Sequence, residues 1–239
     1  MPDKIIHMLA DEELLSQQAV RWMKSQEAWL ISKFCHEAAE ESDSFLVSVF
    51  MAGSPGAGKT EVSKELIKFF KKKPVRIDAD EIRSLCPGYT GNNAHVFQQA
   101  ANKGVNMLYD YVLHSHYNVI LDGTFAYAGA LDNIQRSVDK GRMVLLDFVY
   151  QDPIVAWEFT KKREALEKRH VSKDVFIDTY FRSQEHVNQA KARFDDQVLL
   201  TLFIKDHEKG TEFSQINIPR LDPYLPKVYS RSELEKLII

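Results

Sequence analysis

The stretch FLVSVFMAGSPGAGKT, residues 45–60, decides the fold of this chain. Its first half is an apolar run typical of a buried strand, and its second half fits the phosphate-binding loop pattern G-x-x-x-x-G-K-[ST]. The loop comprises Gly53, Ser54, Pro55, Gly56, Ala57, Gly58, Lys59 and Thr60. Glycines recur because backbone N–H groups must converge on the phosphate oxygens, and side chains would block that approach. The stretch predicts a strand that runs into a site for a nucleoside triphosphate.

The last two residues of the loop have separate predicted tasks. Lys59 is placed to reach the β- and γ-phosphates, and the Thr60 hydroxyl can ligate the Mg²⁺ that bridges them. Residues 61–70 are predicted to form a helix whose positive N-terminal end points at the same anion. We therefore expect ATP or GTP as the ligand and Mg²⁺ as the cofactor.

Composition limits the class of protein. The chain has 239 residues, and 44% of them are hydrophobic, which suffices for one sizeable core. Its net charge of −3 does not indicate nucleic acid or an anionic membrane as a partner. Cys35 and Cys86 match no zinc or redox spacing, which indicates buried or idle thiols in a reducing compartment. Without a stretch of about 20 apolar residues or a signal-peptide pattern, we expect a cytoplasmic protein with no membrane partner.

Strands and helices alternate along the rest of the chain. Further strands are predicted at residues 75–78, 118–124, 143–150 and 198–204. Helices are predicted at residues 95–116, 127–140 and 173–194, and another begins at Asp152 or Pro153. The tail is expected to be loop-like until a short helix near residues 232–237. This alternation predicts an α/β fold of the P-loop NTPase or small-kinase type, a mostly parallel sheet of five to six strands with helices on both faces.

The first 44 residues are predicted to be an N-terminal helical extension, and residues 45–239 a P-loop kinase domain. Trp22, Trp29 and Phe34 recur at roughly helical spacing in the extension. They are either core residues, which the spacing favours, or a stripe that docks a partner.

Asp78 and Asp80 follow directly on a predicted strand, at the sheet edge where ligands of such folds bind. A carboxylate there can accept the proton of an acceptor hydroxyl and orient it for attack on the γ-phosphoryl group. Either residue can instead cap the helix expected near Glu81. Both roles are compatible if Asp78 is structural and Asp80 is catalytic.

The segment VILDGT, residues 119–124, has the form of a Walker B strand whose acid, Asp122, acts on Mg²⁺ directly or through water. Asp147 is a weaker rival because apolar residues continue the strand beyond it. Thr124 either hydrogen-bonds the substrate or is an ordinary turn residue.

Basic residues concentrate in residues 157–170, close behind the fourth strand. Transfer of a phosphoryl group spreads negative charge over its oxygens, so a cationic helix that closes over the site would stabilise it and exclude water. Such a helix is typical of a small kinase, and we expect a lid around residues 152–172. The alternative is a solvated charged helix in which Glu164 and Glu167 pair locally.

These motifs in this order resemble the zeta toxin family of P-loop kinases. The resemblance rests on GSPGAGKT, IDADEIR, LDGT and KKREALEKRHVSKDVFID, and covers about residues 45–195. It implies transfer of the γ-phosphate of ATP or GTP to a hydroxyl of a nucleotide sugar. In characterised toxins of the family the acceptor is the 3′-hydroxyl of UDP-N-acetylglucosamine.

The resemblance also implies roles for individual residues. Lys59 and Thr60 would hold phosphates and metal, and Asp80 would be the base. Arg83 would help to position the substrate, and Thr124 would contact the acceptor. The lid cations would be Arg163 and Arg169.

The chain departs from the family in three respects. Gln98 and Gln99 stand near the place where family toxins grip the amino sugar with an acidic residue, which puts the acceptor in doubt. The lid arginines lie closer together, so Lys162 or Lys168 can share their task. The 44-residue leader is too short for a fused antitoxin, although it can dock one.

Two rival functions stay open. One is a P-loop kinase of another acceptor, such as a sugar, an antibiotic or a polynucleotide end. The other is a nucleotide-gated module that binds a protein through its N-terminal helices, although sensing alone needs neither a base nor closing cations.

Overall fold

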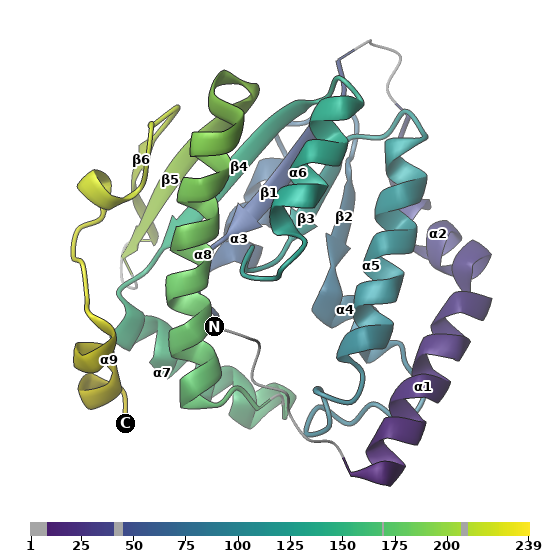
Figure 1. Cartoon of the computed structure of the whole chain (residues 1–239). Helices are drawn as coiled ribbons and strands as arrows, with labels where there is room; N and C mark the ends of the chain where they lie inside the picture. Colours follow the sequence, from purple (N-terminus) through teal and green to yellow (C-terminus); the bar gives the residue numbers. More distant parts are fainter. Residues whose placement is uncertain (1–8, 41–44, 169, 207–209) are drawn as a thin grey trace.

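The computed structural model describes residues 9–40, 45–168, 170–206 and 210–239, and these form one six-stranded sheet with helices around it (Figure 1). The sheet order is β2-β3-β1-β4-β5-β6. The strands are β1 (Val47–Ala52), β2 (Val75–Asp78), β3 (Val119–Asp122), β4 (Met143–Tyr150), β5 (Val198–Asp206) and β6 (Gly210–Gln215). All pairs are parallel except β5 with β6. The predicted mostly parallel α/β sheet is therefore confirmed.

Strand β1 lies inside the sheet between β3 and β4 because it is apolar on both faces. Val49 stands opposite Ile120 and Leu145, and residues 48–52 are all buried. The loop that follows β1 thus leaves the sheet near the middle of its carboxyl edge.

Strand β6 has no counterpart among the predicted elements. Its sequence, GTEFSQ, is mostly polar, so the hydrophobic pattern gave no signal for residues 210–215. The strand runs antiparallel to β5, and the register shifts between Ile204 and Lys205.

Helices cover both faces of the sheet. They are α1 (Ala10–Ser25), α2 (Glu27–Cys35), α3 (Lys59–Ile67), α4 (Ala79–Ser84), α5 (Gln98–Leu113), α6 (Ala130–Asp139), α7 (Pro153–Glu167), α8 (Lys173–Phe194) and α9 (Arg231–Leu237). Short 3₁₀ turns cover Asp195–Gln197 and Asp222–Tyr224. Figure 1 shows α5, α6 and α8 in front of the sheet and α3 behind it.

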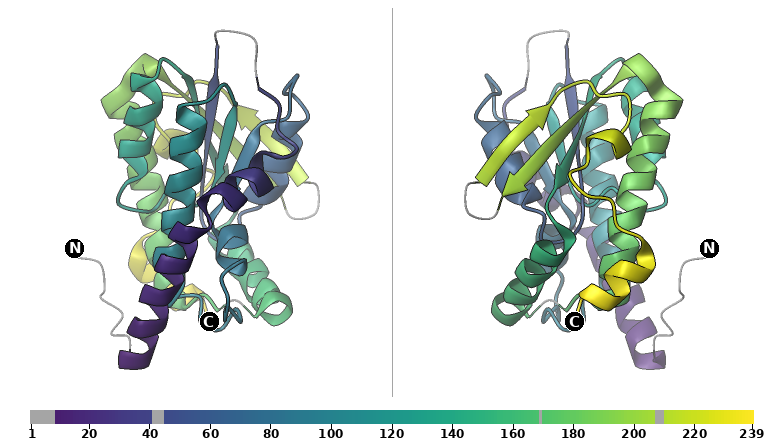
Figure 2. Two further views of the ribbon diagram at one scale, coloured as in Figure 1. Left: turned by 90° about the vertical axis from the view of Figure 1, so that its right-hand side faces the viewer. Right: turned by 90° about the vertical axis from the view of Figure 1, so that its left-hand side faces the viewer.

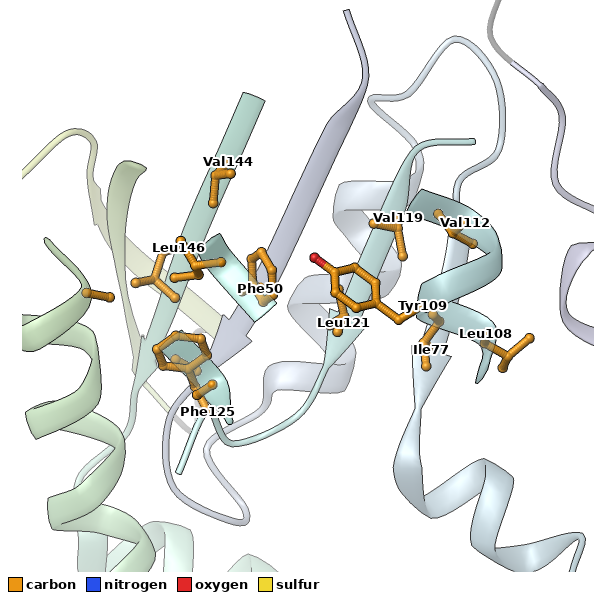
Figure 3. Close-up of a cluster of buried hydrophobic side chains, with 14 of the residues drawn as sticks. Phe50, Ile77, Leu108, Tyr109, Val112, Val119, Leu121, Phe125, Val144 and Leu146 are labelled. Carbon is orange, nitrogen blue, oxygen red and sulfur yellow. The ribbon is translucent and has the colours of Figure 1, made fainter. Parts of the chain in front are cut away.

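Side-chain alternation along β1 divides the core in the same way. Val49 and Met51 pack with residues of α3, whereas Phe50 belongs to the larger cluster on the other face. There the Phe50 ring lies edge-on to those of Tyr109 and Phe125, with ring centroids 6.2 and 6.0 Å away (Figure 3). Packing on both faces of the sheet therefore fixes β1, and with it the start of the loop that follows.

The N-terminal helices pack against α5. Met23 and Leu30 are fully buried, and they approach Gly104 so closely that an added Cβ would lie 3.0 Å from the Met23 sulfur. Trp22 packs edge-on against Trp29, which remains 44% exposed. The expected core position is therefore wrong for Trp29, because the helix turns its aliphatic residues inward instead. The domain boundary at residue 44 stays a prediction.

Candidate active site

A pocket of about 580 Å³ opens at the carboxyl edge of the sheet. The phosphate-binding loop, the ends of β2 and β3, helix α7 and the end of β5 all contribute to it. The residues that line it are Pro55, Gly56, Ala57, Gly58, Lys59, Thr60, Glu61, Lys64, Asp78, Asp80, Asp122, Gly123, Thr124, Gln151, Phe159, Arg163, Lys205 and Asp206. One cavity thus unites most of the predicted site residues, which come from segments far apart in the sequence.

The phosphate-binding loop packs tightly against the backbone of β4 and α7 at two glycines. A Cβ on Gly56 would lie 2.1 Å from the Ala156 carbonyl oxygen, and one on Gly53 would lie 2.4 Å from that of Val149. Both glycines have positive φ, +72° and +132°, which side-chain-bearing residues rarely adopt. These positions must be glycine for the backbone to take this course.

Helix α3 begins at Lys59, two residues earlier than predicted, so its N-terminus coincides with the end of the loop. The Lys59 ammonium donates a hydrogen bond to the Ser54 carbonyl oxygen, 2.6 Å away. The lysine is thereby held across the loop, beside backbone N–H groups of the helix terminus that attract an anion.

Asp78 takes the predicted capping role, and the catalytic role of Asp80 stays a prediction. The Asp78 carboxylate accepts the backbone N–H of Asp80 at 2.8 Å and caps α4, whereas Asp80 lies in the first helical turn with its side chain 34% exposed. Both residues line the pocket. Burial is the largest cause of a raised pKa for Asp78, followed by the nearby carboxylates of Asp80 and Asp122. Asp80 is thus the more accessible of the two acids.

Arg83 binds the side chain of Asp80 and fixes its position. Its guanidinium donates to the Asp80 carboxylate at 2.5 Å and to the Gln98 side-chain oxygen at 2.6 Å, and its side chain is only 5% exposed. Arg83, Gln98 and Gln99 do not line the pocket. In this conformation Arg83 positions the acid, and the substrate contacts expected of these three residues stay predictions.

Arg76, on β2, is a site residue that the sequence analysis missed. Its guanidinium donates to the same Asp122 oxygen through Nε at 2.9 Å and Nη2 at 2.6 Å, and to Asp78 at 2.6 Å. The Ser63 hydroxyl adds a further bond to that Asp122 oxygen, at 2.7 Å. A basic residue within the short strand VRID was the available signal. Arg76 therefore joins the acids at the ends of β2 and β3.

Asp147, the rival Walker B acid, does not line the pocket. Its exposed fraction is 3%, and burial raises its pKa to about 7, while a hydrogen bond from Thr201 offsets part of that rise. The protein interior around β4 thus favours the neutral acid. Asp122 is the acid that the fold brings to the phosphate-binding loop.

Thr60 and Asp122 have oxygen donors of the kind Mg²⁺ prefers. Among the residues that the structure describes, no three His, Cys, Asp or Glu side chains form a group able to hold a metal ion. A hydroxyl and one carboxylate fit a Mg²⁺ ion that takes its other ligands from phosphates and water. The metal role of the two residues stays a prediction.

Helix α7 follows β4 at the carboxyl edge of the sheet (Figure 2), and it carries one predicted lid cation, Arg163, to the pocket. Asp152 caps the helix, as its carboxylate accepts the Ile154 N–H at 2.9 Å. Phe159 and Arg163 line the pocket, but Lys162 and Lys168 do not. Arg169 lies outside the described residues. Lys161 and His170 pair with Glu164, as the alternative of local pairing expects for that residue, while Arg163 lines the pocket. Closure of this segment over the site stays a prediction.

The strand order, the loop at the sheet edge and the acid beside it define a P-loop protein of the kinase type. The sequence profile described as Zeta toxin matches residues 26–218. The chain therefore belongs to the zeta toxin family, and the resemblance inferred from its motifs is confirmed. No curated protein sequence matches it.

Solved structures show the same fold. A structure of the PezAT chromosomal toxin-antitoxin system of Streptococcus pneumoniae has a similar chain, with a TM-score of 0.64 and 16% identity over 98% of this chain and 90% of that one. A chain in the structure of AvrRxo1-ORF1 and AvrRxo1-ORF2 with ATP is also similar, with a TM-score of 0.54 and 14% sequence identity. The match covers 84% of this chain and 65% of that one. Helices long and apolar enough to span a membrane are absent from the described part of the chain.

Proposed function

We propose that the protein transfers the γ-phosphoryl group of ATP or GTP to a hydroxyl of a nucleotide sugar. The 3′-hydroxyl of UDP-N-acetylglucosamine is the first acceptor to test. The observation that carries the proposal is that Asp80, Lys59 and Arg163 line one pocket, although they come from β2–α4, the loop and α7. Nucleotide binding alone would need no accessible carboxylate opposite the phosphate lysine.

The reaction assigns one task to each group. Lys59 and the loop hold the β- and γ-phosphates, and Asp80, fixed by Arg83, accepts the proton of the acceptor hydroxyl. The acceptor oxygen forms a bond to the γ-phosphorus while the bond to the β,γ-bridging oxygen breaks, and the nucleoside diphosphate leaves. Arg163 neutralises charge on the transferred group. Mg²⁺, bound with the nucleotide at Thr60 and near Asp122, would supply further neutralisation.

Asp80→Asn tests the mechanism, because the amide keeps the shape of the side chain and loses its basicity. We expect transfer from γ-labelled ATP or GTP to UDP-N-acetylglucosamine to fall by at least 10²-fold, as general-base catalysis contributes about 10²- to 10⁴-fold. Asp139→Asn, on α6 away from the pocket, is the matched control and should leave the rate unchanged. An unaffected rate in Asp80→Asn would remove this residue from the mechanism.

A different acceptor is the main alternative, because Gln98 binds Arg83 where family toxins offer an acid. A screen of cell metabolites for a phosphorylated product decides between the acceptors. If a sugar, an antibiotic or a polynucleotide end gains the label and UDP-N-acetylglucosamine does not, the reaction stands and the acceptor changes.

We propose in addition that the chain is the toxin of a toxin–antitoxin pair and that α1 and α2 dock the protein antitoxin. The family supports the first part, and the exposed side chains of Leu14 and Trp29 support the second. Expression should arrest growth, and Lys59→Ala should relieve the arrest. Growth at the normal rate with active enzyme present would instead indicate a housekeeping kinase.

A further inference from the structure

Two cations in the pocket, Lys64 and Lys205, have no task in the reaction just described. Lys205 lines the pocket at the carboxyl end of β5, one residue beyond Ile204, the last β5 residue paired with β4. Its side chain forms no hydrogen bond or ion pair with any residue in the described ranges. An ammonium group left unpaired beside an anion-binding loop is a candidate ligand contact.

The backbone aims this lysine at the loop. The pairing of β5 with β6 shifts register between Ile204 and Lys205, and such an irregularity re-aims the side chain that it displaces. A Cβ on Gly58 would lie 3.1 Å from Lys205 Cε and 3.5 Å from its Nζ. Gly58 has a φ of +89° and directly precedes Lys59. The ammonium therefore lies over the loop itself.

The acidic groups nearby do not neutralise Lys205. Glu61 Oε2 lies 3.5 Å from the same Cβ position, yet the two side chains form no ion pair. Asp206, the next residue along β5, also lines the pocket, and no ion pair joins it to Lys205. The three acids at the ends of β2 and β3 lie on the other side of β1 from β5. The pocket thus has an acidic end, suited to an acceptor hydroxyl, and an end where cations flank the loop.

The position of Lys205 along the loop selects the phosphates that it can reach. In loops of this type the backbone N–H groups hold the α- and β-phosphates, while the loop lysine reaches the β- and γ-phosphates. Lys205 approaches the loop at Gly58 and not at the acidic end. We propose that Lys205 is a donor-binding residue that contacts the α- and β-phosphates of the nucleotide. This inference rests on the proposed function for the identity of the donor.

The proposal makes a prediction that separates Lys205 from Lys59. ADP retains the α- and β-phosphates, so Lys205→Met should weaken ADP and ATP binding by the same factor. The loss of one charge-assisted hydrogen bond should raise the Kd about tenfold. Methionine keeps most of the aliphatic length of lysine. Lys205→Arg should bind both nucleotides within about threefold of the wild type because it restores the charge.

The experiment is calorimetric titration of the full chain with ADP and with ATP, in the absence of any acceptor. Lys140→Met is the control, because Lys140 is an exposed lysine on the turn after α6, at the opposite edge of the sheet. Melting temperatures of all variants check that each one folds. Lys140→Met should match the wild type for both nucleotides.

The outcomes distinguish this proposal from the function on which it rests. ADP affinity of Lys205→Met within twofold of the wild type, or a loss confined to ATP, overturns the role of Lys205 alone. If ADP binds as predicted but no acceptor is phosphorylated, the proposed transfer fails and the role of Lys205 stands. A wild-type chain that binds neither nucleotide overturns both.

Discussion

The two sides of the pocket hold their charges in different ways. At the sheet edge, Arg76 and Arg83 are nearly buried and each binds carboxylates at 2.5 to 2.6 Å. On α7 the basic residues are exposed, and Lys161, like His170 beyond the helix, pairs with the neighbouring Glu164. The strand ends therefore present a fixed set of acids, whereas α7 presents an exposed cation, Arg163, whose position depends on one helix.

This contrast indicates a division of labour. A base and a phosphate cradle must be preorganised, because misplacement by about 1 Å costs roughly 10²-fold in rate. The proposed lid would instead carry its cation toward the nucleotide and away from it, so ion pairs to the rest of the fold would hinder it. The C-terminal segment anchors the first half of α7, where the Tyr229 hydroxyl donates to Asp152 at 2.6 Å and the Trp157 indole N–H donates to the Ile239 carbonyl oxygen at 2.9 Å. Substitutions on the two sides should accordingly affect different quantities.

The largest expected effect is on stability, from Arg76→Met. The change leaves the carboxylates of Asp78 and Asp122 without their shared cation in a mostly buried position. Breaking such a pair costs about 3 to 5 kcal/mol. Urea denaturation should show the loss as a lower midpoint at pH 7. Arg76→Lys, which keeps the charge but not the forked geometry, should lose less; equal losses would mean that packing matters more than charge at this position.

Asp147 tests whether a buried charge matters away from the pocket. Burial raises its pKa from 3.8 to about 7, so folding favours the protonated acid, and the stability it contributes is lost as the pH rises from about 4 through 7. Asp147→Asn removes the charge. It should therefore stabilise the protein by about 4 kcal/mol at pH 8, since one pKa unit corresponds to about 1.4 kcal/mol. Denaturation at pH 4 and at pH 8 should show this gain only at the higher pH.

Most elements could be predicted from the sequence because their signals are local. The bounds of β2, β4 and α8 match the predicted ones to the residue, since apolar runs and capping residues mark their ends. Strand β6 has no such signal, because its partner and not its own sequence makes it a strand. Helix α3 begins at Lys59 because the loop and the helix share the two residues that a motif assigns to the loop.

The candidate site divides in the same way. The motif residues Lys59, Asp80 and Asp122 were found because each follows a strand, and parallel strands bring their ends together. Arg76 and Lys205 were missed because their importance lies in partners distant along the chain. Asp122 is 46 residues from Arg76, and the approach of Lys205 to Gly58 depends on a shift in strand register. Sequence spacing carries no trace of such contacts.

Arg163→Met should affect catalysis and leave stability unchanged. The side chain is exposed on α7 and lines the pocket, so its charge is expected to act on the transferred phosphoryl group and not on the fold. Loss of one such contact should lower kcat by roughly 30-fold, or about 2 kcal/mol in the transition state. Single-turnover transfer rates, measured beside denaturation midpoints, separate the two quantities.

The matched control lies one residue further along the same helix. Glu164→Gln removes the local partner of Lys161 and His170, which are not pocket residues, so neither kcat nor the denaturation midpoint should change measurably. If Arg163→Met instead lowers the midpoint as much as Arg76→Met and spares kcat, the lid helix is part of the fixed framework. The division between a rigid edge and a closing arm would then be wrong, because both sides of the pocket would be held by structural charges.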